Sequence, residues 1–259
     1  AVVLEVGTGS GLVAMMAARA GAAKVVSCEV LPLMADIARE VVAKNGLAER
    51  ITILTRKSTQ LQVGAELPAP ADVFVSELLN IGMLSPNMLP VLQHARENLL
   101  KPGGKIIPAA AVVHAALIEA PQLYRVNPVR QISGFDLSPL DKLRSPGYAQ
   151  IDMAADLIRQ LSQPFRALDF DFRQNMPERD AKLLQVTATT SGIVHGIAFW
   201  FDLVMDEEIV YSSASPARSN HWKQAAEFFL KPIAVQPGDR VNIVAAYDNT
   251  RIQFRHAGL

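Results

Sequence analysis

The chain has 259 residues, of which 50% are hydrophobic and 19% charged, with 25 basic and 25 acidic side chains. This composition is typical of one large or two small globular domains and excludes a disordered chain. The balanced charge gives no global field that attracts nucleic acid, and no apolar run approaches the roughly 20 residues that cross a bilayer, so we expect neither partner.

Strands and helices alternate up to about residue 109. Apolar runs predict strands at residues 2–6, 24–29, 51–55, 72–76 and 105–107, and amphipathic patterns predict helices at 12–20, 33–45 and 86–100. Gly46 follows the second helix where a C-terminal cap belongs. Continuous apolar strands separated by helices predict a parallel sheet covered on both faces, with ligands bound at the carboxyl ends of its strands.

A glycine-rich turn follows the first predicted strand. Residues 7–11 read Gly-Thr-Gly-Ser-Gly, and Glu29 ends the next strand 22 residues after Gly7. Glycines let backbone approach a ligand, and an acid at this position can accept hydrogen bonds from a ribose diol. A dinucleotide motif needs a further glycine where this chain has Leu12, so the pattern favours S-adenosylmethionine over NAD. The alternative is a turn that is rich in glycine for steric reasons only.

After Pro108 the pattern predicts an antiparallel β domain. Its expected strands cover residues 110–120, 167–173, 182–190, 193–205, 222–230, 240–247 and 251–255. Alternation in residues 199–202 and 241–245 predicts half-buried strands of a sandwich or barrel. Residues 121–164 are rich in Pro, Gly and Arg, which predicts an excursion with short helices. We therefore predict an α/β nucleotide-binding domain at 1–109 followed by a β domain at 110–259.

The single cysteine, Cys28, lies in an apolar strand and cannot form an internal disulfide. We expect a small core residue in a reducing compartment, and hence a cytoplasmic protein. No Cys or His cluster has the spacing of metal ligands, so we expect no metal. The chain has no initiator methionine and starts on its first strand, so we expect that an N-terminal segment has been removed.

A series of short strings runs through nearly the whole chain. They are VLEVGTGSGL at 3–12, Glu29 followed by Pro32, Met34 and Ala35, KNG at 44–46, KST at 57–59, SEL at 76–78 with Leu89-Pro90, GFD at 134–136 and NHWKQ at 220–224. In this order they resemble the protein arginine methyltransferases, most closely the branch that makes monomethylarginine.

The resemblance implies a Rossmann-like S-adenosylmethionine-binding domain, an antiparallel β-barrel or sandwich domain, and an arm at about residues 121–164 that pairs two copies into a homodimer. It implies methyl transfer to a guanidinium nitrogen of a protein or peptide arginine. Glu77 is implied to grip the guanidinium, and His221 and Trp222 to form the opposite wall of the arginine slot. The cofactor contacts that the resemblance implies are Glu5, Gly7, Thr8, Gly9, Gly11, Glu29, Val30, Lys57, Ser58 and Glu77.

The loop after the fourth strand departs from the family pattern. It should carry two glutamates, but only Glu77 is present, no acid occurs from Leu78 to Arg96, and Pro86 stands at the second position. A carboxylate pair holds a guanidinium through charge-assisted bonds, so one partner of this clamp is missing. Two alternatives stay open: a methyltransferase with a small-molecule or other side-chain acceptor, and a catalytically silent cofactor-binding interaction module.

Structural explanations compete with several of these assignments. Glu77 fits a solvated strand end, and His221 with Trp222 fits a packed pair. The remaining histidines, His94, His114, His195 and His256, show no partner pattern, and Phe199, Trp200 and Phe201 are expected in the core. We expect Arg125, Arg130 and Arg144 on a solvated face of the arm. The arm is too apolar to lie bare in water, which favours docking on a partner's first domain; its apolar residues are Ile132, Phe135, Leu137, Leu140, Leu157, Ile158 and Leu161.

Overall fold

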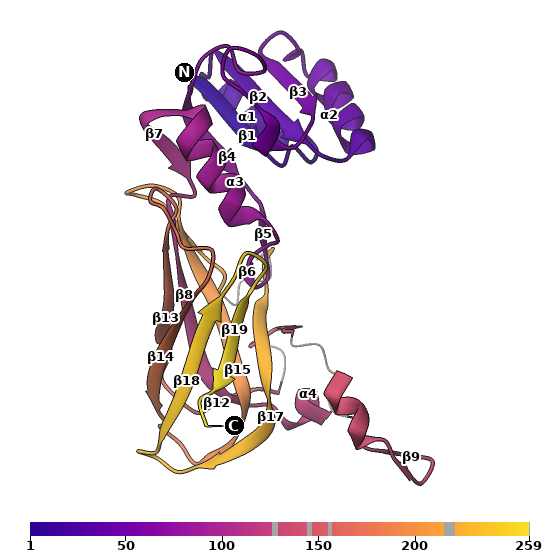
Figure 1. Cartoon of the computed structure of the whole chain (residues 1–259), viewed down its shortest axis with the longest axis vertical. Helices are drawn as coiled ribbons and strands as arrows, with labels where there is room; N and C mark the ends of the chain where they lie inside the picture. The colour runs from indigo at the N-terminus through magenta and orange to yellow at the C-terminus, as the bar shows by residue number, and fades with distance from the viewer. Residues whose placement is uncertain (126–128, 144–146, 155–156, 215–220, 259) are drawn as a thin grey trace.

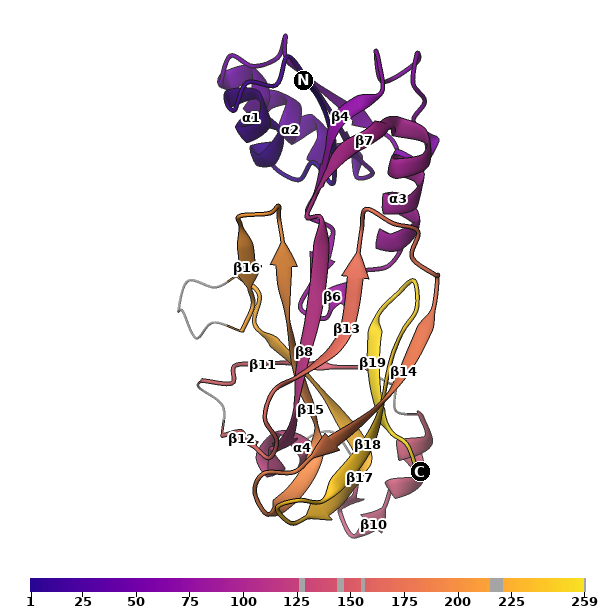
Figure 2. The same ribbon diagram turned by 90° about the vertical axis from the view of Figure 1, so that its left-hand side faces the viewer.

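The computed structural model describes residues 1–125, 129–143, 147–154, 157–214 and 221–258. An α/β domain lies at one end of an elongated molecule, a β domain lies at the other, and an arm projects from the β domain (Figure 1). The view at right angles shows the same two-part arrangement (Figure 2). Among the described residues, no helix combines the length and the apolar character that a membrane span needs.

The first domain is built on a parallel sheet of five strands in the order β3-β2-β1-β4-β7. Apolar side chains point to both of its faces, as the continuous apolar runs predict. One face packs against small residues of two helices, and the other belongs to a cluster that continues into the β domain. The strands are β1 (Val2–Val6), β2 (Lys24–Glu29), β3 (Ile51–Thr55), β4 (Ala71–Ser76) and β7 (Leu100–Ile107), and the two helices are α1 (Leu12–Arg19) and α2 (Pro32–Lys44).

The third helix begins two residues later than the sequence predicts. Helix α3 spans Met88–His94 and continues as a π-helical turn, Ala95–Leu99. Asn87, just before it, has a left-handed φ of 67° and donates its N–H to the carbonyl of Asn249 in the β domain at 3.0 Å. The expected helix start at Pro86 is therefore wrong, because Asn87 already adopts a non-helical conformation.

Two antiparallel sheets form the second domain. The larger has the order β11-β17-β15-β8-β12, with β13 also paired to β8 and β16 to β15, and the smaller has the order β14-β18-β19. Aromatic rings fill the space between the sheets, with Phe170 4.8 Å from Tyr247 and Phe199 5.0 Å from Phe254 between ring centroids. The strands are β8 (Ala110–Glu119), β11 (Ala149–Ile151), β12 (Arg159–Gln160), β13 (Phe165–Asp171), β14 (Asp180–Thr187), β15 (Gly192–Val204), β16 (Val210–Ser212), β17 (Gln224–Val235), β18 (Arg240–Tyr247) and β19 (Ile252–His256).

The predicted alternation is correct for one strand of this domain and wrong for another. Strand β18 alternates between buried and accessible side chains, whereas β15 is buried on both faces. Phe199, Trp200 and Phe201 lie in the core as expected, and Trp200 is 8% exposed. The reason for burial on both faces is a second apolar cluster on the outer face of the large sheet, where Ala198 packs beneath Ile151 and Ile158. The excursion after β8 thus folds back over β15 and removes the solvent-facing side that the sequence predicts.

This fold-back also changes the interpretation of the arm. Leu161 is fully buried in its own domain and Ile158 packs on the outer cluster, so neither belongs to an exposed face. The arm proper consists of α4 (Pro121–Arg125), the hairpin β9 (Gln131–Ile132) and β10 (Phe135–Asp136), and a 3₁₀ turn, Ser138–Leu143. Arg125 is exposed and Arg130 pairs with Asp141 at 3.5 Å, as expected of a solvated face, whereas Arg144 lies outside the described residues.

Two of the histidines that lack a partner pattern in the sequence acquire partners in the fold. His114 pairs with Asp202 at 2.9 Å and stacks on Trp200, and buried His195 accepts the N–H of Ala120 at 3.3 Å. These contacts are structural, as expected.

Candidate active site

The turn after β1 adopts a conformation that only glycine accommodates easily. Gly7, Gly9 and Gly11 have φ values of 90°, 50° and 80°. The N–H groups of Gly7 and Thr8 point back to the carbonyl of Cys28 at 3.1 and 3.3 Å, which ties the turn to β2. A side chain at Gly9 would meet no atom within 4 Å, so this part of the turn faces open space. The turn therefore presents bare backbone at the carboxyl end of the sheet.

Glu29 is the residue that organises the rim of this turn. Its Oε2 accepts the N–H of Gly9 at 3.2 Å, and its Oε1 accepts the N–H groups of Val30 at 2.8 Å and Leu31 at 3.0 Å. Gly9, Glu29 and Val30, which are far apart in sequence, are thus brought together. A carboxylate held here by backbone donors is already oriented and keeps acceptor capacity for a ribose hydroxyl.

Glu5 and Thr8 lie behind the turn rather than at its surface. Glu5 is 1% exposed and its Oε2 accepts the hydroxyl of Ser27 at 2.6 Å, while Ser27 and Thr8 share a hydroxyl bond. Burial raises the pKa of Glu5 to about 7, although the bond from Ser27 opposes the rise. In this structure Glu5 supports the turn from beneath through the hydroxyl groups of Ser27 and Thr8. The neighbouring Cys28 is also buried, and this burial raises the pKa of its thiol to about 12.

Lys57 and Ser58 stand at the carboxyl end of β3. Lys57 precedes a 3₁₀ turn, Ser58–Gln60, and is exposed, whereas Ser58 is 5% exposed. Both therefore lie at the same end of the sheet as Glu29, where the strands have their carboxyl ends. No group of His, Cys, Asp or Glu side chains with the geometry of a metal site occurs within the part of the chain that the structure describes.

Glu77 and His221 come from different domains and lie close enough to interact electrostatically. Glu77 follows β4, whose last residue, Ser76, donates its hydroxyl to the carbonyl of Val6 at 3.1 Å. The Glu77 side chain is accessible, yet the surrounding protein displaces enough water to raise its pKa, and the nearby His221 partly offsets this rise. Trp222 supports the His221 side of the site, because its ring packs edge-on against two aromatic rings. Its ring centroid lies 5.3 Å from that of Tyr211 and 5.7 Å from that of Phe201. Asn220 of the same string lies outside the described residues.

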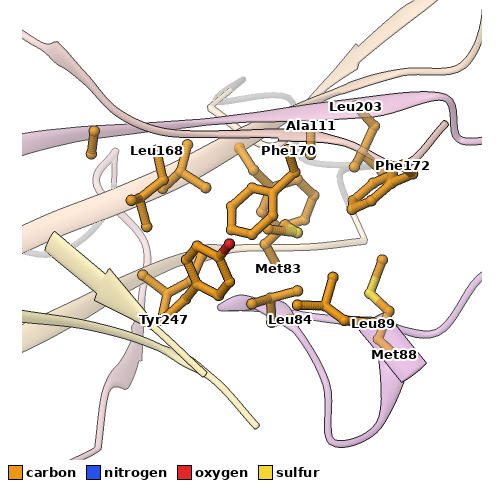
Figure 3. Packing of buried hydrophobic residues seen from close by; sticks show 14 of the residues in the cluster. Met83, Leu84, Met88, Leu89, Ala111, Leu168, Phe170, Phe172, Leu203 and Tyr247 are labelled. Carbon is orange, nitrogen blue, oxygen red and sulfur yellow. The ribbon is translucent and has the colours of Figure 1, made fainter. Parts of the chain in front are cut away.

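The loop that carries Glu77 is built into the β domain. It contains a short hairpin of β5 (Leu79–Asn80) and β6 (Met83–Leu84), in which Met83 is fully buried and Leu84 is 1% exposed. Figure 3 shows Met83 and Leu84 directed at Phe170 and Tyr247 of the β domain. The hydroxyl of Ser85 closes the loop by donating to the carbonyl of Leu78. Packing on the second domain thus contributes to the position of Glu77.

Sequence reasoning missed two residues that contact this hairpin. Asn80 accepts the N–H of Gly82 at 2.8 Å and the hydroxyl of Tyr148 at 3.0 Å. Tyr148 lies 68 residues further along the chain, and no local pattern links it to Asn80. The local signal available in the sequence is a polar residue, Asn80, three positions after Glu77 and two before Gly82.

Comparisons with known proteins agree with this geometry. Residues 3–104 match a methyltransferase domain, and residues 109–258 match the arginine methyltransferase oligomerization subdomain. The first match identifies a methyltransferase and confirms both the predicted enzyme class and S-adenosylmethionine as its cofactor. Because the second covers more than half of the chain, the chain belongs to the arginine methyltransferase family.

Individual relatives support the same family. An arginine N(omega)-methyltransferase of Streptomyces achromogenes subsp. streptozoticus is 37% identical over 239 residues, which is 92% of this chain and 66% of that protein. Protein arginine N-methyltransferase 7 of Oryza sativa subsp. indica is 31% identical over 98% of this chain and 40% of that protein. The chain therefore spans less than two thirds of the length of these curated relatives.

Solved structures share the whole architecture. The Trypanosoma brucei PRMT1 enzyme-prozyme heterotetrameric complex with AdoHcy has a TM-score of 0.81 at 25% identity and covers 94% of this chain and 77% of that chain. Arabidopsis thaliana protein arginine methyltransferase 10 has a TM-score of 0.75 at 20% identity over 98% of this chain and 88% of that chain, which supports the fold alone. The predicted Rossmann-like domain followed by an antiparallel β-barrel or sandwich domain is confirmed.

Proposed function

We propose that the chain transfers a methyl group from S-adenosylmethionine to a guanidinium nitrogen of arginine. The observation that carries this proposal is Glu77, a carboxylate that follows β4 at the end of the sheet where the glycine turn lies and that is near enough to His221 of the β domain to interact with it electrostatically. The side chain of Leu78 lies 3.1 Å from where a Cβ of Gly7 would be, so the loop and the turn are in contact. Cofactor and acceptor sites therefore adjoin, as a direct transfer requires.

The first domain supplies the cofactor site. The glycine turn would contact the methionine part, Glu29 would accept the ribose hydroxyls, and Val30, Lys57 and Ser58 would lie beside the adenine. S-adenosylmethionine supplies an electrophilic methyl group on sulfur. In our assignment Glu5 and Thr8 act from behind the turn, since the hydroxyl bonds through Ser27 keep Thr8 and the adjoining backbone in place.

The reaction depends mainly on how the protein orients the cofactor and the acceptor. Methyl transfer from sulfur to nitrogen is an in-line displacement, so holding the acceptor at near-attack distance supplies much of the acceleration. The Glu77 carboxylate accepts guanidinium N–H groups and draws positive charge toward the nitrogens it touches. His221, on the opposite side, takes the proton that leaves the methylated nitrogen, and Trp222 holds His221 in place.

The names of the relatives indicate two kinds of acceptor. One is called an arginine methyltransferase and the other a protein arginine methyltransferase. We propose a protein or peptide arginine, because the accessible Glu77 lies where an arginine side chain can reach it from a larger chain. Mass spectrometry of products from an arginine-containing peptide, a lysine-substituted copy of that peptide and free arginine would test this. Methylated peptide supports the proposal. Methylated free arginine alone indicates a small-molecule acceptor, and cofactor binding without any product indicates the silent module.

We further propose that the chain forms a homodimer through its arm. The match to an oligomerization subdomain supports oligomer formation in general. The arm exposes Ile132 at 55% and Phe135 at 72%, and the outer faces of α1 and α2 in the first domain also expose large apolar side chains, namely Leu12, Met16, Leu33 and Ile37. Two separated apolar surfaces on one chain are complementary when two copies pair head to tail. Light scattering at micromolar concentration should give the mass of a dimer, and a monomer would contradict the proposal.

A further inference from the structure

Tyr148 occupies an unusual position between the arm and the active site. It immediately precedes β11, the strand on which the excursion returns to the β domain by pairing Ala149 with Ala226 of β17. Its ring is half-buried and stands edge-on to Phe199, with ring centroids 5.6 Å apart and an interplanar angle of 88°. The side chain is thus held by the core of the β domain.

The hydroxyl end of Tyr148 contacts the hairpin that follows Glu77. It donates to Oδ1 of Asn80 at 3.0 Å, and the same oxygen accepts the N–H of Gly82 at 2.8 Å. Burial raises the pKa of Tyr148, which keeps the hydroxyl protonated and able to donate. Any side chain at Gly82 would collide with the Tyr148 ring, so the ring and the hairpin turn are in direct contact.

Further contacts define the shape of the hairpin between Glu77 and Tyr148. The Ser85 hydroxyl bonds to the carbonyl of Leu78, and Met83 adopts a left-handed φ of 73° with its side chain fully buried. Glu77 directly precedes the closed segment that starts at Leu78. The position of the hairpin therefore determines the orientation of the chain at Glu77, between β4 and the hairpin.

From these contacts we infer that Tyr148 is a positioning residue, which holds the hairpin through Asn80 and so aims the Glu77 carboxylate at the acceptor. This inference rests on the proposed function of the site. Glu77 is the one carboxylate of its loop, so no second acid compensates when its direction changes. The same tether joins the return strand of the arm to the acceptor site.

The variant Tyr148→Phe removes the hydroxyl and keeps the ring on Phe199. Loss of one neutral hydrogen bond should lower kcat by roughly three- to tenfold and leave the dissociation constant for S-adenosylhomocysteine unchanged. Greater access of water to Glu77 should also shift the acidic limb of the kcat/KM profile to lower pH, because burial is the main cause of its raised pKa. A purely structural hydroxyl would not move this limb.

A matched control is Tyr124→Phe. The Tyr124 hydroxyl also makes a 3.0 Å bond, to the carbonyl of Leu230, but it lies on α4 away from the hairpin. This variant should leave kcat and the pH profile unchanged.

Hydrogen exchange separates the tether from the reaction. In Tyr148→Phe, the amides of residues 79–84 should exchange faster, which requires no turnover. Unchanged exchange there would overturn the tether. Faster exchange with unchanged kcat and pH profile would overturn the positioning role. A parent protein that methylates no arginine acceptor would overturn both this role and the proposed function, whereas the exchange result would still report on the tether.

Discussion

Glu29 gives the most direct test of the cofactor site, through the variant Glu29→Ala. In the structure its carboxylate accepts three backbone N–H groups, and these lie where water can replace the lost oxygen atoms. We therefore expect the free energy of unfolding to change by less than about 1 kcal/mol. The effect on cofactor binding should be larger, because the ribose hydroxyls lose a charged acceptor.

The size of this effect follows from the strength of such a bond. A hydrogen bond from a ribose hydroxyl to this charged group contributes roughly 1.5–3 kcal/mol. Water recovers part of this contribution, so affinity should fall about tenfold, which corresponds to about 1.4 kcal/mol. Glu29→Gln, which keeps one neutral oxygen acceptor, should fall between the parent and the alanine variant.

Calorimetric titration with S-adenosylhomocysteine measures these affinities. Glu49→Ala is a suitable control, since Glu49 is an exposed acid that precedes β3 at the opposite edge of the sheet. It changes the net charge equally and should bind as the parent does. If Glu29→Ala also binds with the affinity of the parent, Glu29 does not contact the cofactor and our placement of the ribose is wrong.

Three further predictions concern stability, the acceptor site and assembly. The pKa of Glu5 rises from 4.5 to about 7 on folding, so the folded state holds an extra proton between these pH values. The free energy of unfolding therefore falls as pH rises through this range, by about 3 kcal/mol in total. Urea unfolding at pH 5 and pH 8 should show a smaller fall for Glu5→Gln than for the parent, and an identical fall would exclude Glu5 as its source. Pro86 is exposed, so Pro86→Glu should fold. If the loop lacks a second carboxylate, this variant should raise the rate of peptide methylation by roughly one to two orders of magnitude, whereas Glu77→Gln should abolish methylation. A folded Pro86→Glu protein without a gain in rate would contradict the missing-clamp hypothesis. Phe135→Ser removes the most exposed aromatic of the arm and should shift light scattering toward the monomer, and an unchanged mass would place the interface elsewhere.

The first domain was predictable because its signals are local. Each strand is a short apolar run, and the positive φ values of the turn require glycine at positions 7, 9 and 11. The sequence therefore predicts β1, β2 and β3 with the bounds that the structure shows. It also places Glu29 at a strand end, although nothing local predicts that its carboxylate would bind the backbone of Gly9.

The errors arise where distant segments cover one another. Alternation predicts a solvent-facing side for β15, but Ile151 and Ile158 from the excursion bury that side. Leu161 looks like part of an exposed arm for the same reason, although its N–H bonds to the carbonyl of Leu117 in the domain core. The hairpin after Glu77 has two-residue strands, which are too short to show any period.

The position of Glu77 follows from packing that neither domain provides alone. One continuous apolar cluster includes Leu4 and Phe74 of the first sheet, Met83 of the hairpin and Phe170 of the β domain. The cofactor turn is bonded to β2 of the first sheet, whereas the hairpin packs on the β domain. The distance between the two ligands therefore depends on how these layers pack. A cavity in this shared cluster would alter the transfer rate without removing any contact to cofactor or acceptor, because near-attack geometry tolerates displacements of much less than 1 Å.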